Sequence, residues 1–431
     1  MFLICFKTLL VKINLLLQKS TFLSFFMRII FLIFLLLQCF LTLAQNPAFS
    51  TKDNDLRLSS LPYYNYGKGL GLTSPDSLFQ LNLRFRMQNR LTYIDPEDEA
   101  PQYEGQVRRL RLRFDGFVGA PTIMYAIQLS FADGDVGELP DGQNSNIIRD
   151  AVVFYRPNQH WTFMFGQTKL PGNRQRVNSS GALQLTDRSI NNARFNIDRD
   201  FGFQVHYFKN QKDKFSYNIK GAFSNGEGRN FADEPDNGIA LTGKIEVLPF
   251  GSFEKDGANF EGDLVREQNP KLSIAGAFNQ NNAARRTQGQ IGDLLFEQRT
   301  MKSVLLDMIF KYRGFSALAT YMNRSASNPI TFNPLDNTEF NYVFVGNGYD
   351  VQTSYLLPSN YEIISRFSRQ YVEATIHNLY PNTTQYTIGL TKYLWEHAFK
   401  LQTELTFDNQ QFYNGNTSNS FYFRFQVEIG I

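Results

Sequence analysis

Hydrophobic and polar residues alternate with a period of two in many segments of this chain, each about ten residues long. The final segment is the clearest, because each odd position from Phe421 to Ile431 is Phe, Val or Ile, whereas the even positions are Tyr422, Arg424, Gln426, Glu428 and Gly430. Such alternation predicts a strand with one apolar and one polar face. About ten residues of this kind suffice for a tilted strand to cross a membrane.

The pattern predicts sixteen strands, and bacterial single-chain barrels have an even number of them. We therefore predict an all-β fold, in which residues 76–431 form a sixteen-stranded antiparallel transmembrane β-barrel with a third external loop folded inwards. The predicted strands are residues 78–94, 106–118, 121–131, 146–156, 160–168, 200–209, 214–224, 238–248, 270–280, 299–312, 314–324, 339–356, 360–371, 382–394, 397–408 and 419–431.

The lengths of the links between these strands support the count. Short links of one to four residues alternate with longer polar links, as expected when short turns face the periplasm and long loops face outside. One link breaks this rule, because residues 249–269 should form a short periplasmic turn but number 21. The sequence indicates an insertion there and gives no reason for it.

Residues 1–44 have the features of a secretory leader. A basic start at Met27 precedes an apolar run over residues 29–37, and residues 42–44 supply the small side chains of a cleavage site. We predict a signal peptide that starts at Met27 and is cleaved before Gln45. The alternatives are a single transmembrane helix and a lipoprotein acylated at Cys39.

Residues 45–75 have no clear period, and we expect them to form an N-terminal periplasmic arm. Both cysteines, Cys5 and Cys39, lie within the leader, so the processed protein contains no disulfide and no thiolate metal site.

The composition fits a barrel wall with one apolar face and one polar face. Aromatic residues make up 15% of the chain and hydrophobic residues 42%, yet the mean hydropathy is −0.32. The leader carries four of the 43 basic residues and no acidic residue, so the remaining chain has 39 basic and 40 acidic residues, a net charge of −1. Any preference for anions must therefore come from where the charges lie.

Arginines on two predicted strands are the strongest chemical signal. A charge that faces lipid costs about 2–4 kcal/mol near the membrane midplane, so these side chains must face the lumen. A guanidinium is always charged and presents five donors to phosphate or carboxylate oxygens. The alternative is that each arginine pairs with an acid and braces the wall, although Asp115 is the only acid nearby on these strands. The arginines are Arg84, Arg86, Arg109, Arg111 and Arg113, with Arg108 at a strand entrance where it can reach either face.

The link 169–199 is the longest and is the third external loop in strand order. Long loops in compact domains are usually functional, and folding this one inwards would narrow the pore. The alternative is an exposed basic loop that contacts lipopolysaccharide phosphates. Its charged residues are Lys169, Arg174, Arg176, Arg188, Arg194 and Arg199 against Asp187 and Asp198.

Enzymatic, metal and nucleic-acid signatures are weak, and we predict no cofactor and no enzyme. The four histidines have no metal-ligand spacing, and no GxSxG motif accompanies Ser216 near His206. The glycines of residues 67–71 lack P-loop spacing. Aromatic residues such as Trp161 and Trp395 are typical of a membrane interface rather than of base stacking.

Four segments resemble the phosphate-selective porin O and P family. They are RRLRLRFDG at 108–116, IRDA at 148–151, GQTKLP at 166–171 and RDFGFQ at 199–204. The resemblance implies a trimeric sixteen-stranded barrel, in which an arginine ladder and basic residues of the infolded third loop bind phosphate. The residues carried over are Arg108, Arg109 and Arg111, with Arg84 and Lys169. The chain departs from the family in ending with Ile431 in place of Phe and in having few lysines in its third loop.

We therefore expect a porin in the outer membrane of a Gram-negative bacterium that passes small anions, phosphate or related oxyanions, by passive diffusion. Alternatives are a non-selective or organic-solute pore and, from another class, a barrel enzyme such as a phospholipase with a Ser–His pair. Expected partners are inorganic phosphate, outer-membrane lipid or lipopolysaccharide, and two further copies in a homotrimer, with no nucleic acid. The candidate pore-lining residues are Arg84, Arg86, Arg108, Arg109, Arg111, Arg113, Lys169, Arg174, Arg176, Arg194 and Arg199.

Overall fold

The computed structural model describes residues 69–97, 99–136, 147–230 and 238–431, all within one compact unit. The predicted leader and most of the predicted arm lie outside the described residues. Among the described residues, no helix combines the length and the apolar character needed to span a membrane.

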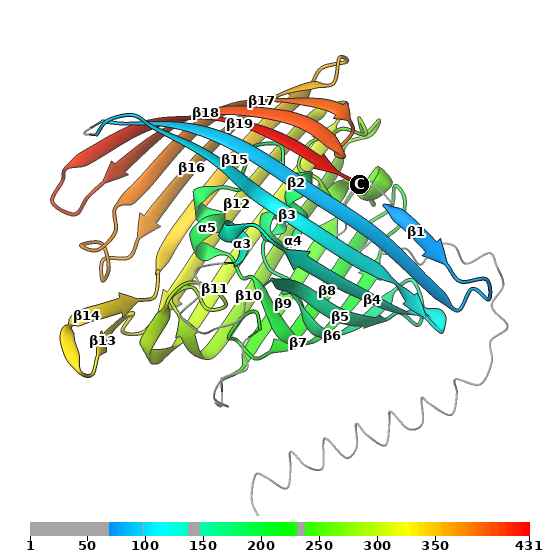
Figure 1. Ribbon diagram of the computed structural model, residues 1–431, viewed down its shortest axis with the longest axis horizontal. Helices are drawn as coiled ribbons and strands as arrows, with labels where there is room; N and C mark the ends of the chain where they lie inside the picture. The colour runs from blue at the N-terminus through cyan, green and yellow to red at the C-terminus, as the bar shows by residue number, and fades with distance from the viewer. Residues whose placement is uncertain (1–68, 98, 137–146, 231–237) are drawn as a thin grey trace, which may run out of the picture. The chain divides into compact units, whose positions relative to one another are not determined.

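Sixteen strands of the described residues form a closed antiparallel ring (Figure 1). Consecutive strands pair with one another, and the ring closes where the last strand pairs with the first, from Ser420 opposite Pro96 to Gly430 opposite Arg86. The predicted sixteen-stranded barrel is thereby confirmed. The strands are β2 (Phe79–Pro96), β3 (Gln102–Val118), β4 (Ala120–Ser130), β5 (Ile148–Tyr155), β6 (Trp161–Lys169), β7 (Arg199–Lys209), β8 (Ser216–Ser224), β9 (Ala240–Leu248), β10 (Lys271–Arg286), β11 (Leu294–Tyr312), β12 (Phe315–Ala326), β15 (Gly346–Leu356), β16 (Tyr361–Val372), β17 (Asn382–Trp395), β18 (Phe399–Gln411) and β19 (Thr417–Gly430).

Three short strands lie outside the ring. β1 (Leu70–Thr73), within the range predicted as an arm, pairs with β2 beyond the end of its pairing with β19. β13 (Ile330–Asn333) and β14 (Asp336–Tyr342) form a separate hairpin. The predicted strand 339–356 is therefore wrong at its start.

The physical reason for this correction is that the backbone between β14 and β15 bonds elsewhere. The N–H of Val343 donates to the carbonyl of Pro329, and that of Phe344 donates to the carbonyl of Thr287. Residues 343–345 therefore cannot continue the ladder, and β15 begins only at Gly346.

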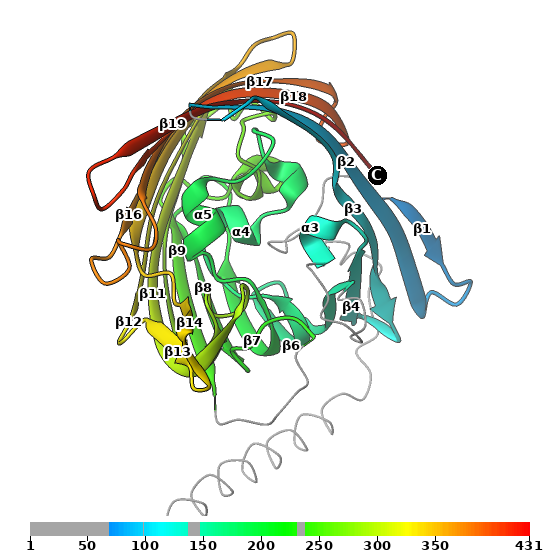
Figure 2. The same ribbon diagram turned by 60° about the vertical axis from the view of Figure 1, so that its left-hand side comes forward.

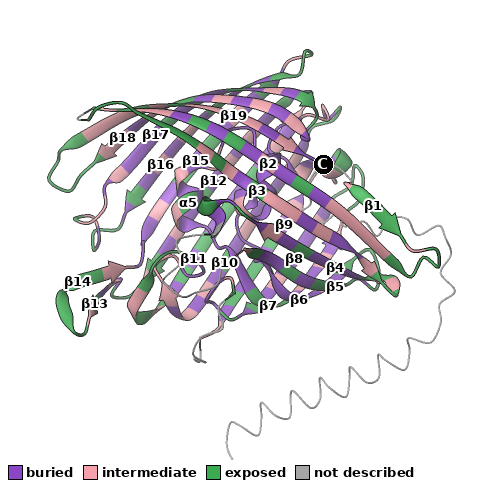
Figure 3. Cartoon of the chain, in the orientation of Figure 1, coloured by how far each residue is buried: buried purple, intermediate pink, exposed green. Residues whose placement is uncertain are grey.

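Buried and exposed residues alternate along most of the wall strands (Figure 3). On β2, Arg84 is 4% exposed and Arg86 is 5% exposed, whereas Phe85 is 37% exposed. The predicted faces are therefore observed, with arginines inside and apolar residues outside, as alternation across a strand requires.

β11 departs from simple alternation because its inner face carries both charged and apolar residues. Asp307, Lys311, Leu305 and Ile309 share this face, and each is at most 4% exposed. Leu305 and Ile309 each belong to a hydrophobic cluster that includes a residue of a connecting segment. Leu170, between β6 and β7, packs in the cluster of Leu305, and Phe253, between β9 and β10, packs in that of Ile309. The mixed face seen in the sequence therefore indicates a wall that is covered from inside.

Short helices occur in the segments that connect the strands. α3 (Asp133–Val136) follows β4, and α4 (Arg174–Val177), η2 (Ser180–Ala182) and α5 (Ile190–Phe195) lie between β6 and β7. Figure 2 shows α3, α4 and α5 within the ring of strands. A further 3-10 segment, η3 (Glu254–Asn259), follows β9. The barrel therefore contains chain from more than one connection.

The outward face of β11 gives a test of the barrel wall. Leu306 is 48% exposed on this face, whereas Leu335 is 96% exposed at the tip of the β13–β14 hairpin. We expect Leu306→Arg to lower the free energy of unfolding by about 2–4 kcal/mol, because it puts a charge into lipid. Leu335→Arg should change it by less than about 0.5 kcal/mol. Reversible urea titration in lipid vesicles measures both, and equal effects would contradict the assigned outward face.

Candidate functional site

The largest of the three described cavities, with a volume of about 560 Å³, lies between the wall and the segment 170–198. The other two have volumes of about 20 and 40 Å³. Ten cationic side chains and three carboxylates line the large cavity, which gives an excess of seven formal positive charges. The cations are Arg108, Arg109, Arg111, Arg149, Lys169, Arg176, Arg188, Arg199, Arg229 and Arg424, and the carboxylates are Asp135, Asp187 and Asp198.

A bulge in β3 brings two neighbouring arginines to the same face. Gln88 of β2 lies opposite Arg109, but the next residue, Asn89, lies opposite Val107, so Arg108 is the extra residue. A bulge of this kind locally resets the alternation of side chains. Arg108 and Arg109 therefore both point into the lumen, which settles the direction that the sequence left open for Arg108.

Asp187, from the segment 170–198, is shared by three arginines. Its carboxylate oxygens lie 2.8 Å from Arg108, 3.0 Å from Arg109 and 3.2 Å from Arg90. One negative charge among three guanidinium groups leaves the cluster positive. The loop thus attaches to β2 and β3, while the arginines of these strands keep a net positive charge.

Asp135 of α3 plays a similar part on the next strands. It forms ion pairs with Arg111 of β3 and, at 3.0 Å, with Arg149 of β5, and it accepts a hydrogen bond from Ser130. The short helix α3 therefore supplies the carboxylate that the strand sequences lack at this level.

Two further carboxylates hold Arg199 at the start of β7. Asp150 lies 2.9 Å from Arg199, and Asp198 lies 3.5 Å from it and 2.5 Å from Arg176. Arg199 is 2% exposed and is fixed from two sides. The ion pair between Arg176 and Asp198 keeps the first turn of the loop beside this strand.

Burial acts to raise the pKa of Asp187, but Arg108, Arg109 and Arg90 together lower it well below its usual value of 3.8. The same balance of burial and neighbouring guanidinium groups lowers the pKa of Asp198 well below that value. For Arg188, burial and the positive charge of Arg109 lower the pKa well below its usual value. The potential inside the cavity is therefore positive, and it favours negative charge.

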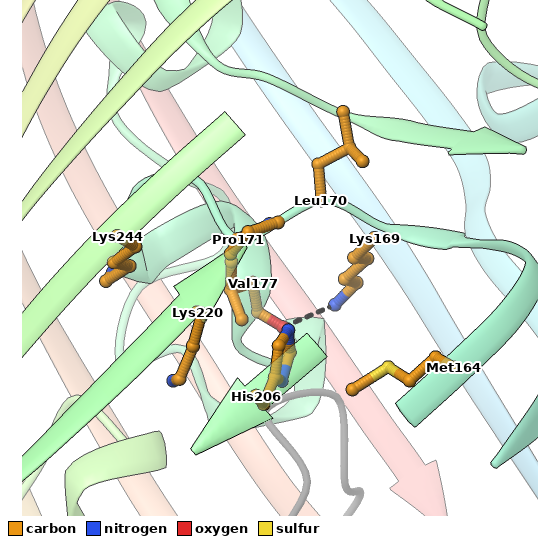
Figure 4. A pocket seen from close by; sticks show the side chains of 8 residues that line it. All are labelled: Met164, Lys169, Leu170, Pro171, Val177, His206, Lys220 and Lys244. Carbon is orange, nitrogen blue, oxygen red and sulfur yellow. Dashed lines mark hydrogen bonds between the residues drawn. The ribbon is translucent and has the colours of Figure 1, made fainter. Parts of the chain in front are cut away.

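Lys169, at the end of β6, anchors the loop at its beginning. Its ammonium group donates to the carbonyl oxygen of Val177 at 2.7 Å (Figure 4). It also donates to the carbonyl oxygen of Asn178 at 3.0 Å. Leu170 and Met164 line the small cavity beside it, together with polar side chains such as those of His206 and Lys220. Lys169 therefore borders the large cavity, but its ammonium group is already hydrogen-bonded to two carbonyl oxygens of the loop.

Comparison with known proteins identifies the kind of barrel. Residues 79–244, from β2 into β9, match the family described as phosphate-selective porin O and P. This range contains β3, β5, β6 and β7, which supply six of the ten cations of the cavity. The protein is an outer-membrane porin. The predicted family resemblance is confirmed over that range.

Solved structures show the same fold at low sequence identity. The outer-membrane channel DcaP of Acinetobacter baumannii has a TM-score of 0.51 and 14% identity, covering 84% of this chain and 99% of its own. The OmpF of Salmonella typhi, solved with daunomycin, has a TM-score of 0.52 and 11% identity, covering 83% of this chain and 100% of its own. No curated protein matches the sequence.

Six of the eleven predicted residues of this porin line the large cavity, and five do not. Arg84 and Arg113 share Asp115, each at 2.9 Å, inside the wall. Arg86 lies 3.1 Å from Glu428 of β19 and donates to Ser179 of the loop. The residues that line the cavity are Arg108, Arg109, Arg111, Lys169, Arg176 and Arg199.

The remaining two predicted residues lie elsewhere in the loop. Arg174 pairs with Asp307 of β11 at 2.9 Å and with Glu246 of β9 at 2.8 Å. Arg194 donates to the hydroxyl of Tyr380 at 2.9 Å and lies over the ring of Phe344. Both side chains attach the loop to other parts of the porin instead of lining the cavity.

Sequence reasoning missed four cavity cations as candidate sites. Arg424 continues the alternation of the last strand, and Arg149 stands within the IRDA segment, so a signal existed for both. Arg188 was recognised as a loop charge but not as a site. Arg229 follows β8, and nothing in the sequence indicates its approach to Asp135, whose carbonyl accepts its hydrogen bond at 2.9 Å.

The low pKa of Asp187 gives a pH test of the network. Because its folded pKa lies below the unfolded value, its ion pairs stabilise the porin fully above about pH 4 and are lost as the pH falls further. In carboxyl-¹³C NMR spectra, we expect the Asp187 signal, assigned with Asp187→Asn, to stay ionised from pH 7 to about pH 4. Burial raises the pKa of Asp256 to about 6, so its signal is an internal control. Titration of Asp187 near pH 4 or above would contradict the network.

Proposed function

We propose that this porin passes small anions, with phosphate and related oxyanions preferred, by passive diffusion through the cationic cavity. The observation that carries the proposal is the lining of this cavity, where ten cations face three carboxylates. An anion entering it exchanges water for guanidinium donors, which lowers the cost of dehydration.

The pairing of these cations with carboxylates also suits a cavity that lets an anion pass rather than one that binds it tightly. Asp187 occupies part of the guanidinium fork of Arg109, and Asp198 part of that of Arg176, so an oxyanion that enters there competes with a carboxylate. Conduction requires sites that are strong enough to admit an ion and weak enough to release it. Within the described residues, buried N–H groups of Arg109, Arg149 and Arg424 have no hydrogen-bond partner, so unused donors accompany the paired ones.

The segment 170–198 is, in this proposal, the constriction of the pore. It supplies Arg176 and Arg188 to the cavity, together with two of the three carboxylates. Its backbone is held at both ends, by Lys169 at its start and by Arg324 of β12, which donates to the carbonyls of Arg194 and Asn196. We also propose contacts with outer-membrane lipopolysaccharide and a homotrimer, of which the trimer rests on the family resemblance.

A second candidate is a non-selective or organic-solute pore in which arginines serve as struts. The ion pairs of Arg84 and Arg113 with Asp115, and of Arg86 with Glu428, favour it, because these cations are satisfied within the wall. It predicts that phosphate leaves chloride current unchanged.

Block of chloride current by phosphate in planar bilayers tests the proposal. We expect micromolar to millimolar phosphate to reduce the current, and Arg109→Gln to weaken the block by roughly tenfold, since a charge-assisted hydrogen bond contributes about 1.5–3 kcal/mol. Arg299→Gln is the matched control, because Arg299 pairs with Glu297 on β11 and does not line the cavity. A chloride current that phosphate leaves unchanged would favour the second candidate.

Asp187→Asn should act in the opposite direction to Arg109→Gln. It removes the carboxylate that three arginines share, so the excess positive charge of the cavity grows by one. We expect phosphate to block this variant at a concentration roughly three- to tenfold lower than it blocks the parent protein. A block that weakens in both variants would mean that the charge of the cavity does not determine phosphate binding.

A further inference from the structure

The segment 249–269, which the sequence left unexplained, packs inside one end of the barrel. Phe253 is 7% exposed and packs with Leu248, Ile309 and Leu318 from the inner faces of β9, β11 and β12. The ammonium group of Lys311 donates to the carbonyls of Gly257 and Gly262, at 2.8 and 2.5 Å. The insertion therefore covers part of the mixed inner face of β11, including Ile309 and Lys311.

The same segment extends across the barrel to later strands. Arg266 donates to the carbonyl of Leu356 at 2.8 Å, at the end of β15. Phe260 stacks on His397, between β17 and β18, with ring centroids 4.6 Å apart. The insertion thus connects the strand ends from β9 to β18.

Glu261 joins this segment to the loop 170–198. Its carboxylate accepts hydrogen bonds at 3.0 Å from the side chain of Gln175 and from the backbone of Gln184, both in the loop. It also accepts one at 3.2 Å from Gln352 of β15, while its own N–H donates to Ala182 at 3.1 Å. The hydroxyl of Ser316 on β12 donates to its carbonyl oxygen at 2.5 Å, so five hydrogen bonds meet at one residue that is 2% exposed.

The loop is bound to the same half of the wall along its length. Gln402 of β18 donates to the carbonyls of Gln184 and Leu185, at 2.8 and 3.0 Å. Asn191 donates to the carboxylate of Asp350, on β15, at 2.9 Å. The inner side chains that these segments cover are at most 7% exposed, namely Glu246, Asp307, Lys311, Asp350, Gln352, Glu362, Lys400, Gln402 and Glu404.

We propose that residues 249–269 and 170–198 together form a cross-wall that closes the half of the lumen beside β9 to β18. Ion flow is then confined to the other half, beside the arginines of β3, β5 and β7. Glu261 is the positioning residue that holds the two segments together. This inference rests on the proposed function, because it assigns the insertion a role in selectivity: it removes a path on which ions would not meet the cavity.

The test uses the full-length porin in planar bilayers and three variants. In the first, residues 252–266 are replaced by a short turn like the other periplasmic turns. In the second, Glu261→Gln removes the charge that accepts three hydrogen bonds. The control is Glu254→Gln, in the same segment, because Glu254 is half exposed and its carboxylate meets only the exposed Lys212, at 3.6 Å, among the described residues.

We expect the shortened variant to conduct about twofold more, since the closed half of the lumen opens. Its reversal potential in a salt gradient should move towards zero, and vesicles that contain it should admit larger neutral sugars. Glu261→Gln should move the reversal potential in the same direction by a smaller amount, and Glu254→Gln should leave it unchanged. A merely structural role would lower the number of inserted channels but would not alter the selectivity of each one.

The outcomes separate this inference from the proposed function. Unchanged conductance and sugar size limit in the shortened variant would overturn the cross-wall, even if the parent porin prefers anions. A cation-preferring parent porin whose shortened variant conducts about twofold more would overturn the proposed function but leave the cross-wall standing. If the shortened variant fails to insert, Glu261→Gln decides alone, and a reversal potential equal to that of Glu254→Gln would overturn the proposal.

Discussion

The structure depends on one constraint, which is that every backbone polar group of a segment in lipid must be hydrogen-bonded within the protein. The closed ring from β2 to β19 meets this constraint and fixes the direction of the side chains, because residues alternate across each strand. Arginines on alternate positions of β2 and β3 must then face inwards. Once inside, each needs a counter-charge or water, since an unpaired buried charge is costly.

Three of the counter-charges beside the cavity come from connecting segments rather than from the strands that carry the arginines. Asp135 belongs to α3, and Asp187 and Asp198 belong to the segment between β6 and β7. These three carboxylates, with Asp150 of β5 beside Arg199 and Glu404 of β18 beside Arg424, cannot balance ten cations, so pairing holds the segments in place and still leaves the cavity positive. The same contacts thus hold the loop in place and support the proposed preference for anions.

The sequence was sufficient for the wall and for the inward direction of its charges, because alternation is a local property. Each of the sixteen strands was located, and Arg84 and Arg109 were assigned to the correct face. It was not sufficient for partners, because Asp187 lies 78 residues from Arg109 along the chain and meets it only through the fold of the loop. The mixed inner face of β11 and the long link after β9 were both visible in the sequence. Their common cause, an insertion packed on that face, required the structure.

We propose that ions cross this porin beside more positive than negative charge. The sign of the reversal potential of the unmodified porin in a potassium chloride gradient tests it most directly. We expect a sign that corresponds to a higher permeability for chloride than for potassium, with a reversal potential that becomes smaller at high salt, where charges are screened. A sign that corresponds to higher permeability for potassium, at low as well as at high salt, would contradict it.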